Sequence, residues 1–318
     1  MLRKINFFLI FISIFLVNSC DKTPVLGFIT NQESNKLDII DLSIKKKIKE
    51  LELGKDPAGI YIDRKNGKVF ISNPSSDNIS QISLDNYSHK FIVSGRSPMS
   101  IYFSELYNLL FATNWYDHTV SVIDPLKNKV IKVIKVGNSP AGIYISDRKK
   151  KGFVANREDN TVSVIDLENF SEIKKIIVEK APYGVFSYEE LDIIFITNVQ
   201  SSSITLIDSN SLDVIANIKV GKWPYQVAFN KINKLIYVTN QRDNSISVIN
   251  VKDKKVIKTI KDVCEYPEGI DISYRENLLI VACWFDDNII LLDLNNYKFV
   301  RSISVSGGPR AFGKFIVE

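Results

Sequence analysis

The sequence predicts an all-β fold built from seven copies of one four-stranded unit. Two observations carry this prediction: a proline recurs every 41–43 residues, and two polar columns keep the same step. The prolines are Pro57, Pro98, Pro140, Pro182, Pro224, Pro267 and Pro309. One polar column consists of Asn31, Asn73, Asn114, Asn156, Asn198 and Asn240, with Cys283 in the seventh place. The other consists of Asp41, Ser83, Asp124, Asp166, Asp208, Asn250 and Asp293. A period of this length is typical of repeat proteins, whose units stack to bury a common core.

The repeat that begins at Pro224 shows what each unit contains. Its four apolar runs are Gln226–Phe229, Leu235–Thr239, Ser245–Ile249 and Lys255–Ile260. Short runs rich in Val, Ile, Phe and Tyr, separated by polar turn residues, predict antiparallel strands joined by hairpins. Helical repeats would need longer runs with 3.6-residue spacing, which the repeat lacks. Four strands in each of seven units predict a seven-bladed β-propeller. Below, the strands of a blade are called inner, second, third and outer, in chain order from each proline.

The repeated residues fit this assignment. Proline suits the first residue of an inner strand, because it has no backbone N–H to leave unpaired. Small residues follow two positions later in several repeats, for example Gly59, Gly142 and Gly184, as crowding of seven backbones around one axis requires. The Asn and Asp columns end the second and third strands, where we expect them to act as turn formers.

Short motifs then recur in most blades. Tyr237–Asn240 reads YVTN, and Ser121–Asp124 and Ser163–Asp166 both read SVID. With these motifs the chain resembles the YVTN-repeat family of bacterial seven-bladed propellers, the YncE-like proteins. The resemblance covers residues 25–317 and implies the fold. It implies no particular activity, because the signature residues build blades and one fold hosts many functions.

The ends of the repeat predict how the ring closes. The chain enters the first blade on a second strand, Leu26–Thr30, and leaves on an inner strand, Arg310–Val317. Three N-terminal strands and one C-terminal strand should therefore complete one blade, which removes both free sheet edges. The propeller domain is then residues 25–318.

The first residues predict export. Arg3 and Lys4 precede the apolar run Ile5–Val17, and Cys20 follows it. A basic start, a short apolar run and a small residue before a cut indicate a signal peptide, here residues 1–19. Cys20 resembles the lipidated cysteine of bacterial lipoproteins, which would make residues 20–24 a lipidated tether and anchor the protein to the cell envelope, on its periplasmic or surface side. An uncleaved anchor and ordinary secretion are the alternatives.

Strand alternation sorts the loops onto two faces. The upper face carries the loops that precede each inner strand and those between second and third strands; the lower face carries the others. Lysine runs such as Lys45–Lys47 and Lys149–Lys151 fall on the lower face, where the tether also begins. We therefore expect the lower face to rest on an anionic membrane. The alternatives are that these lysines only solubilise loops, or that they bind DNA nonspecifically, although aromatic residues for base stacking are not interleaved with them.

Aromatic and arginine side chains gather on the upper face instead. The candidate partner-binding residues are Trp115, Tyr116, Arg157, Tyr183, Trp223, Tyr225, Arg242, Trp284, Phe285 and Arg310. Exposed aromatic residues at a concave mouth predict a site for a protein or small ligand, on what we expect to be a monomer. The alternative is that the rings pack between blades or close the channel.

The sequence offers little for catalysis. Only two histidines exist, His89 and His118, and they fall on opposite faces, which excludes a multi-histidine metal site. We therefore assign no catalytic residue, metal or cofactor. A lactonase-like or lyase-like centre at the channel mouth, with Glu268, Asp117 and Arg310 near His118, is the alternative. Cys264 and Cys283 lie near the upper end of one blade and could form a disulfide outside the cytoplasm.

Overall fold

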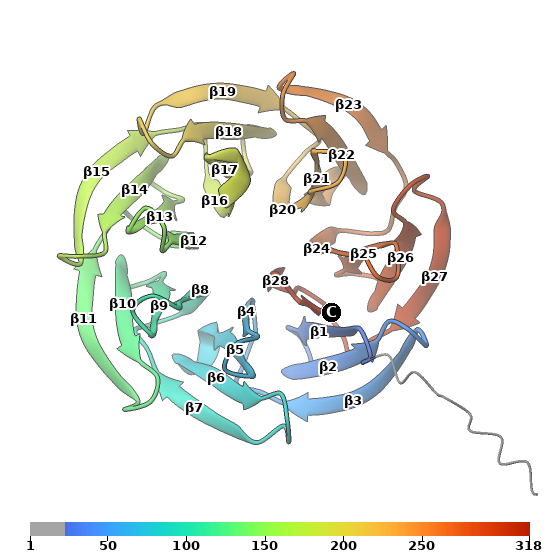
Figure 1. The fold of residues 1–318 in the computed structure, drawn as a ribbon, viewed down its shortest axis with the longest axis horizontal. Coiled ribbons are helices and arrows are strands. Elements are labelled where there is room, and N and C mark those ends of the chain that lie inside the picture. The colour runs from blue at the N-terminus through green and yellow to red at the C-terminus, as the bar shows by residue number, and fades with distance from the viewer. Residues whose placement is uncertain (1–22) are drawn as a thin grey trace, which may run out of the picture.

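A computed structural model describes residues 23–318 as a closed ring of seven antiparallel sheets around a central channel (Figure 1). This confirms the predicted seven-bladed propeller. The expected signal peptide and the lipidated Cys20 lie outside the described residues. Within the described part of the chain, no helix has the length and apolar character needed to span a bilayer.

The strands recur at equivalent positions in each blade. The inner strands are β4 (Gly59–Asp63), β8 (Pro98–Ser104), β12 (Pro140–Ser146), β16 (Pro182–Tyr188), β20 (Pro224–Asn230), β24 (Pro267–Ser273) and, in the first blade, β29 (Ile316–Val317). The second strands are β1 (Leu26–Asn31), β5 (Lys68–Asn73), β9 (Leu109–Asn114), β13 (Lys151–Asn156), β17 (Ile193–Asn198), β21 (Leu235–Asn240) and β25 (Leu278–Cys283). The third strands are β2 (Lys36–Asp41), β6 (Asn78–Ser83), β10 (Thr119–Asp124), β14 (Thr161–Asp166), β18 (Ser203–Asp208), β22 (Ser245–Asn250) and β26 (Asn288–Asp293). The outer strands are β3 (Lys46–Glu52), β7 (His89–Val93), β11 (Lys129–Lys135), β15 (Ser171–Ile177), β19 (Val214–Lys219), β23 (Lys255–Ile260) and β27 (Phe299–Ser304). Three short 3₁₀ turns are η1 (Pro74–Ser76), η2 (Glu189–Leu191) and η3 (Gln241–Asp243), and β28 (Phe312–Gly313) is described with the ring closure. Blades 1 to 7 are numbered in the order of their second strands.

The core lies between neighbouring blades. One cluster joins Phe111 and Val122 of blade 3 to Ile143, Val154 and Ile165 of blade 4, all fully or almost fully buried. Other clusters join other pairs of neighbours in the same way. Each sheet therefore buries both faces, which explains why its second and third strands are almost continuously apolar.

The YVTN motif has a specific task at each position. In blade 6, Tyr237 and Val238 are buried in the core. The Thr239 hydroxyl accepts a hydrogen bond from Gln226 N of its own blade and donates to Glu268 O of blade 7, at 3.2 and 2.7 Å. Thr30, Ser72, Thr113 and Thr197 bind in the same way. The hydroxyl thus links successive inner strands, at a place where the register of the inner strand shifts.

The two polar columns differ in mechanism. Asp124 forms the predicted turn, because its carboxylate accepts the N–H groups of Leu126 and Lys127. The Asn column does not form such turns: Asn114 is buried and donates to the hydroxyls of Thr119 and Ser121 on the third strand. The prediction of turn formation was therefore right for Asp and wrong for Asn, since a buried amide needs partners that the adjacent strand supplies.

The upper-face loops are fixed in an unusual backbone conformation. The residue before each of the seven prolines has a φ between 51° and 61°, although only one of them is glycine. Each of these N–H groups except that of Trp223 donates to a side chain of the preceding blade, as Ser97 does to Asp77 and Ala181 to Asn160. These bonds offset the cost of a left-handed conformation and couple each blade to the next.

The ring closes as predicted, with one difference. Three N-terminal strands and β29 form blade 1, and the N–H of Arg310 donates to Thr30 O at 2.8 Å. The residues expected to form one continuous strand, however, leave the sheet midway. Phe312 and Gly313 form β28, which lies inside the ring and pairs in parallel with β4 of blade 2 (Figure 1). Residues 310–317, called the closing segment below, therefore join two sheets.

Candidate functional site

A strip of aromatic side chains crosses blades 6 and 7 on the upper face. The Arg242 guanidinium lies 3.5 Å from the ring centroid of Trp223. The ring centroid of Tyr266 lies 5.2 Å from that of Phe285 and 6.2 Å from that of Trp284. The positive charge of Arg242 on blade 6 acts on the Tyr266 hydroxyl, where it opposes the rise in pKa that burial causes. Phe285 is 60% exposed. These five residues, Trp223, Arg242, Tyr266, Trp284 and Phe285, are called the blade 6–7 strip.

A smaller group lies across the ring on blades 3 and 4. The Arg157 guanidinium is 5.9 Å from the ring centroid of Trp115, and Tyr116 is 63% exposed. The predicted upper-face residues therefore form two groups on separate sides of the ring.

Three predicted surface residues lie instead in the channel, where Tyr183 and Tyr225 are buried and the Arg310 side chain is 13% exposed. The Arg310 guanidinium donates to the hydroxyls of Tyr225 and Tyr183 at 2.6 and 2.9 Å, and both tyrosines are buried. Phe312 packs below them, with ring centroids 5.4 and 5.1 Å from Tyr183 and Tyr225. These residues close the upper channel. The alternative that side chains close the channel is therefore correct for these three residues, because they contact one another and Phe312 instead of solvent.

A buried carboxylate completes this plug. Glu268 accepts a hydrogen bond from Gln241 at 2.8 Å and lies 3.3 Å from Arg310 Nε. Burial raises the pKa of Glu268 to about 7, although Arg310 opposes the shift. Gln241 was not singled out in the sequence, but it stands directly after the YVTN asparagine, where its side chain can reach the axis.

The groups proposed for acid–base work are held in other roles. His118 Nδ1 accepts the N–H of Ser139, so His118 occupies the position that Asn160 occupies one blade later. Asp117 binds Arg96 at 2.6 Å, and bonds from Arg96 lower the pKa of Asp117. Figure 1 places the loop between β9 and β10 across the ring from β24, which carries Glu268. The structure does not bring these residues together.

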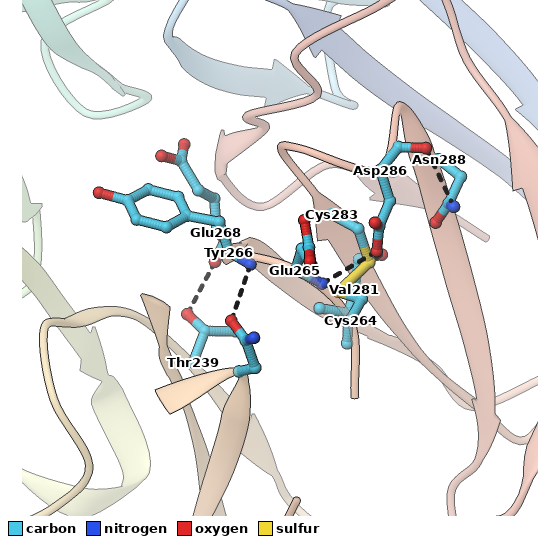
Figure 2. Close-up of a disulfide and its surroundings, with 10 residues drawn as sticks. Thr239, Cys264, Glu265, Tyr266, Glu268, Val281, Cys283, Asp286 and Asn288 are labelled. Carbon is cyan, nitrogen blue, oxygen red and sulfur yellow. Dashed lines mark hydrogen bonds between the residues drawn. A yellow bond between two sulfur atoms is a disulfide. The ribbon is translucent and has the colours of Figure 1, made fainter. Parts of the chain in front are cut away.

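Cys264 and Cys283 form a disulfide with a Cα–Cα distance of 5.9 Å (Figure 2). In blades 2, 3, 4 and 6 the same two positions hold Gly and Asn, and a Cβ on that Gly would approach Asn side-chain atoms to 2.5–2.7 Å. The disulfide occupies this contact in blade 7. Within residues 23–318, the only group with metal-ligand spacing is Cys264, Cys283 and Asp286, and its two sulfur atoms are joined to each other.

The lower face carries the expected lysines, and several are paired. Lys149 lies 2.7 Å from Asp192, and Lys150 lies 2.6 Å from Glu168. Thr23 also lies here, because its carbonyl accepts a bond from Arg275 in a lower-face loop. The described part of the chain thus starts on the face predicted to bear the tether.

A cavity of about 350 Å³ occupies the channel below Phe312. Tyr61, Tyr102, Tyr144 and Phe186 line it from four successive blades. A second recess of about 230 Å³ shares Arg64, Tyr188, Asp271, Lys314 and Ile316 with it and reaches the lower-face loops. The sequence signal for this cavity was present but unused: an aromatic residue stands four positions after Pro57, Pro98, Pro140 and Pro182.

Comparison with known families agrees with this architecture. Residues 148–257 match the family model described as a YNCE-like beta-propeller. These residues, which belong to blades 4 to 6, are similar to that family. No curated protein sequence matches it.

Several solved structures resemble this chain in fold. A protein from Lactobacillus plantarum aligns with a TM-score of 0.77 and 15% identity, over 92% of this chain and 98% of that one. A functionally unknown protein from Desulfotomaculum acetoxidans aligns with a TM-score of 0.76 and 14% identity, over the same shares. Hydrazine synthase from Kuenenia stuttgartiensis aligns with a TM-score of 0.74 and 14% identity, over 84% of this chain and 91% of that one. At such identities the likeness shows the fold alone.

Proposed function

We propose that this YncE-like propeller is a binding module that recognises a protein partner through its upper face, with the blade 6–7 strip at the centre of the contact. The observation that carries the proposal is the strip itself: Trp223, Arg242 and Tyr266 connect to an exposed Phe285 across two blades. Trp, Tyr and Arg are the residue types that dominate protein interfaces. Among residues 23–318, we find no comparable arrangement that would favour an enzymatic or DNA-binding function.

The proposal includes a location. Lipidation at Cys20 would tether the propeller to the bacterial envelope from its lower face, because Thr23 is held there by Arg275. The upper face would then point away from the membrane, toward partners. Because several lower-face lysines are already paired, the lipid rather than the lysines would supply most of the membrane attachment.

Site-specific photocrosslinking in the native host tests the partner site. A photoreactive phenylalanine analogue at Phe285 is expected to give a discrete adduct with another protein, while the same analogue at Tyr116 is the matched control of equal exposure. For the partner identified from the adduct, Trp223→Ala with Phe285→Ala should weaken binding by about 100-fold, since two hot-spot residues each contribute about 1.4 kcal/mol or more. Trp115→Ala with Tyr116→Ala should not. Equal losses in both pairs, or none in the first, would refute the strip as the site.

A further inference from the structure

We propose that the lower channel is a second binding site, which takes a small carboxylic acid with a flat apolar body. The body would lie in the 350 Å³ cavity, and the acid group would lie at the opening beside Arg64 and Lys314. This site is independent of the upper-face strip, because the plug of Arg310, Tyr183, Tyr225 and Phe312 separates the two.

The cavity has the size and lining of a ligand site. Pockets for small molecules begin at roughly 300 Å³ and are lined mainly by apolar and aromatic side chains with a few polar groups. Here the ring centroids of Tyr61 and Tyr102 are 4.8 Å apart, and those of Tyr102 and Tyr144 are 5.4 Å apart. Aliphatic side chains face the same space from several blades, including Ile101, Val185 and Ile270. A continuous aromatic wall favours a flat apolar ligand, because rings gain most from stacked or edge contacts.

The closing segment forms part of the site. Phe312 closes the upper end of the cavity, and Gly313 and Lys314 line its side. Gln226 holds Gly313 in place, donating to its carbonyl at 2.6 Å and accepting its N–H at 3.3 Å. A glutamine stands here although most blades have a small residue at this position. One wall of the cavity therefore depends on a side chain that is specific to blade 6, and not only on the spacing of the seven inner strands.

The opening holds three basic side chains, Arg64, Lys231 and Lys314, and three acidic ones, Glu190, Asp271 and Glu318. An anion is favoured because two of the three acidic groups already bind donors of the protein. Asp271 already accepts the N–H groups of Phe315 and Ile316 at 2.9 and 3.0 Å, so its carboxylate is engaged. The carboxylate of Glu318 likewise accepts bonds from Ser273 and from the N–H of Arg275. Arg64 and Lys314, in contrast, are not paired with a carboxylate in these contacts. Arg64 donates to the carbonyl of Ile316, and Lys314 lies 4.9 Å from the ring centroid of Tyr188. Both have donor capacity left for a carboxylate.

Three probes of matched shape test the chemistry by titration calorimetry. They are 2-naphthoate, the neutral 2-naphthamide and the cationic 2-naphthylmethylammonium. The expected order of affinity is anion, then neutral compound, then cation. Tightest binding of the cation would overturn the proposal in favour of an aromatic cage, and binding of none of the three would overturn it altogether.

Variants locate the site. Arg64→Gln with Lys314→Gln is expected to weaken naphthoate binding about tenfold and leave naphthamide binding unchanged, because only the acid group loses its partners. Lys258→Gln is the matched control, since Lys258 lies 4.6 Å from the centroid of the Tyr297 ring on another part of the molecule. Tyr102→Leu should weaken both probes. Loss of naphthoate binding in the control, or unchanged binding in the double variant, would contradict the assignment.

A direct structural readout keeps the test valid if Tyr102→Leu fails to fold. Crystals of the wild-type protein soaked with 6-bromo-2-naphthoate should show the anomalous bromine signal inside the channel, below Phe312. Bromine found only on the outer strands, where Ile177 and Phe299 are exposed, would show that the probe binds nonspecific apolar surface and would refute the site.

Discussion

A few polar and aromatic side chains close the upper end of the channel. Glu268 is buried against Arg310, Gln241 and the tyrosine hydroxyls that Arg310 binds. Burial disfavours the charged carboxylate of Glu268 more than Arg310 favours it, so its ionisation costs free energy in the folded state. The ionisation of Glu268 should therefore be visible in the stability of the whole ring.

Replacing Glu268 tests this at the residue scale. The folded-state pKa of about 7 is above the ordinary value of 4.5, so the carboxyl stabilises the fold below pH 4.5 and this contribution is lost as the pH rises to 7. Glu268→Gln cannot ionise. The free energy of unfolding of the wild type, relative to this variant, should fall by about 3 kcal/mol between pH 4.5 and 7.5.

Urea unfolding at the two pH values measures the difference. Glu265→Gln, an exposed carboxyl in the same loop, is the control and should follow the wild type. Parallel pH profiles for the wild type and Glu268→Gln would show that the pKa of Glu268 is not raised by burial.

At the scale of the strands, hydroxyl groups hold neighbouring blades together. Five blades use the Ser or Thr of the YVTN position to connect two inner strands. Blades 4 and 7 have Ala155 and Ala282 there, and a methyl group can make neither bond. The links between blades are consequently unequal around the ring.

Opposite substitutions at this position should have opposite effects. Thr197→Val is expected to lower the free energy of unfolding by about 1–3 kcal/mol, because Gly184 N and Tyr225 O lose their buried partner. Ala155→Thr should raise it by about 1 kcal/mol by adding the missing link. Urea midpoints at constant m-value report both changes. A destabilising Ala155→Thr would mean that blade 4 has no room for the hydroxyl.

The sequence predicted most of this architecture, because every strand is repeated seven times and errors at one copy are corrected by the others. The sequence also indicated the disulfide. The Gly that stands three residues before the proline in four blades and the Asn that ends the second strand are both replaced by Cys in blade 7, at Cys264 and Cys283. What it could not predict is the path of the closing segment, which occurs once and has no repeat to compare with. The burial of Tyr183 and Tyr225 escaped prediction for a related reason, since a place at the upper end of an inner strand does not say whether a side chain points to the axis or to solvent.

At the scale of the whole molecule, a few residues decide whether the ring is closed. Gly313 has a φ of 145°, and a Cβ there would lie 2.1 Å from Ile60 O of blade 2. Phe312, Phe315 and Ile316 of the same segment are buried. Closure therefore depends on one glycine that lets two backbones meet and on three apolar side chains that fill the space around it.

Removing residues 310–318 should open blade 1 and expose the edges of β1 and β4. Burial of three large apolar side chains contributes about 5–9 kcal/mol, so the melting temperature should fall by roughly 10 °C or more for a domain of this size. Gly313→Ala should give a smaller loss of the same kind. Gly67→Ala is its control, since Gly67 also has a positive φ but no atom lies near its Cβ position. Unchanged cooperative melting of the truncated protein, followed by calorimetry, would show that the ring closes without this segment.

The closing segment has one more consequence, which is thermodynamic. Its residues bind blade 2 on one side and line the lower cavity on the other. Any molecule that contacts Phe312 or Lys314 only when the segment is in place binds the closed ring and not the open one, and so it must shift the equilibrium toward closure. Ligand binding in the channel and the stability of the closed ring are therefore thermodynamically linked. A ligand can be detected by the rise in melting temperature that it causes, before its chemistry is known.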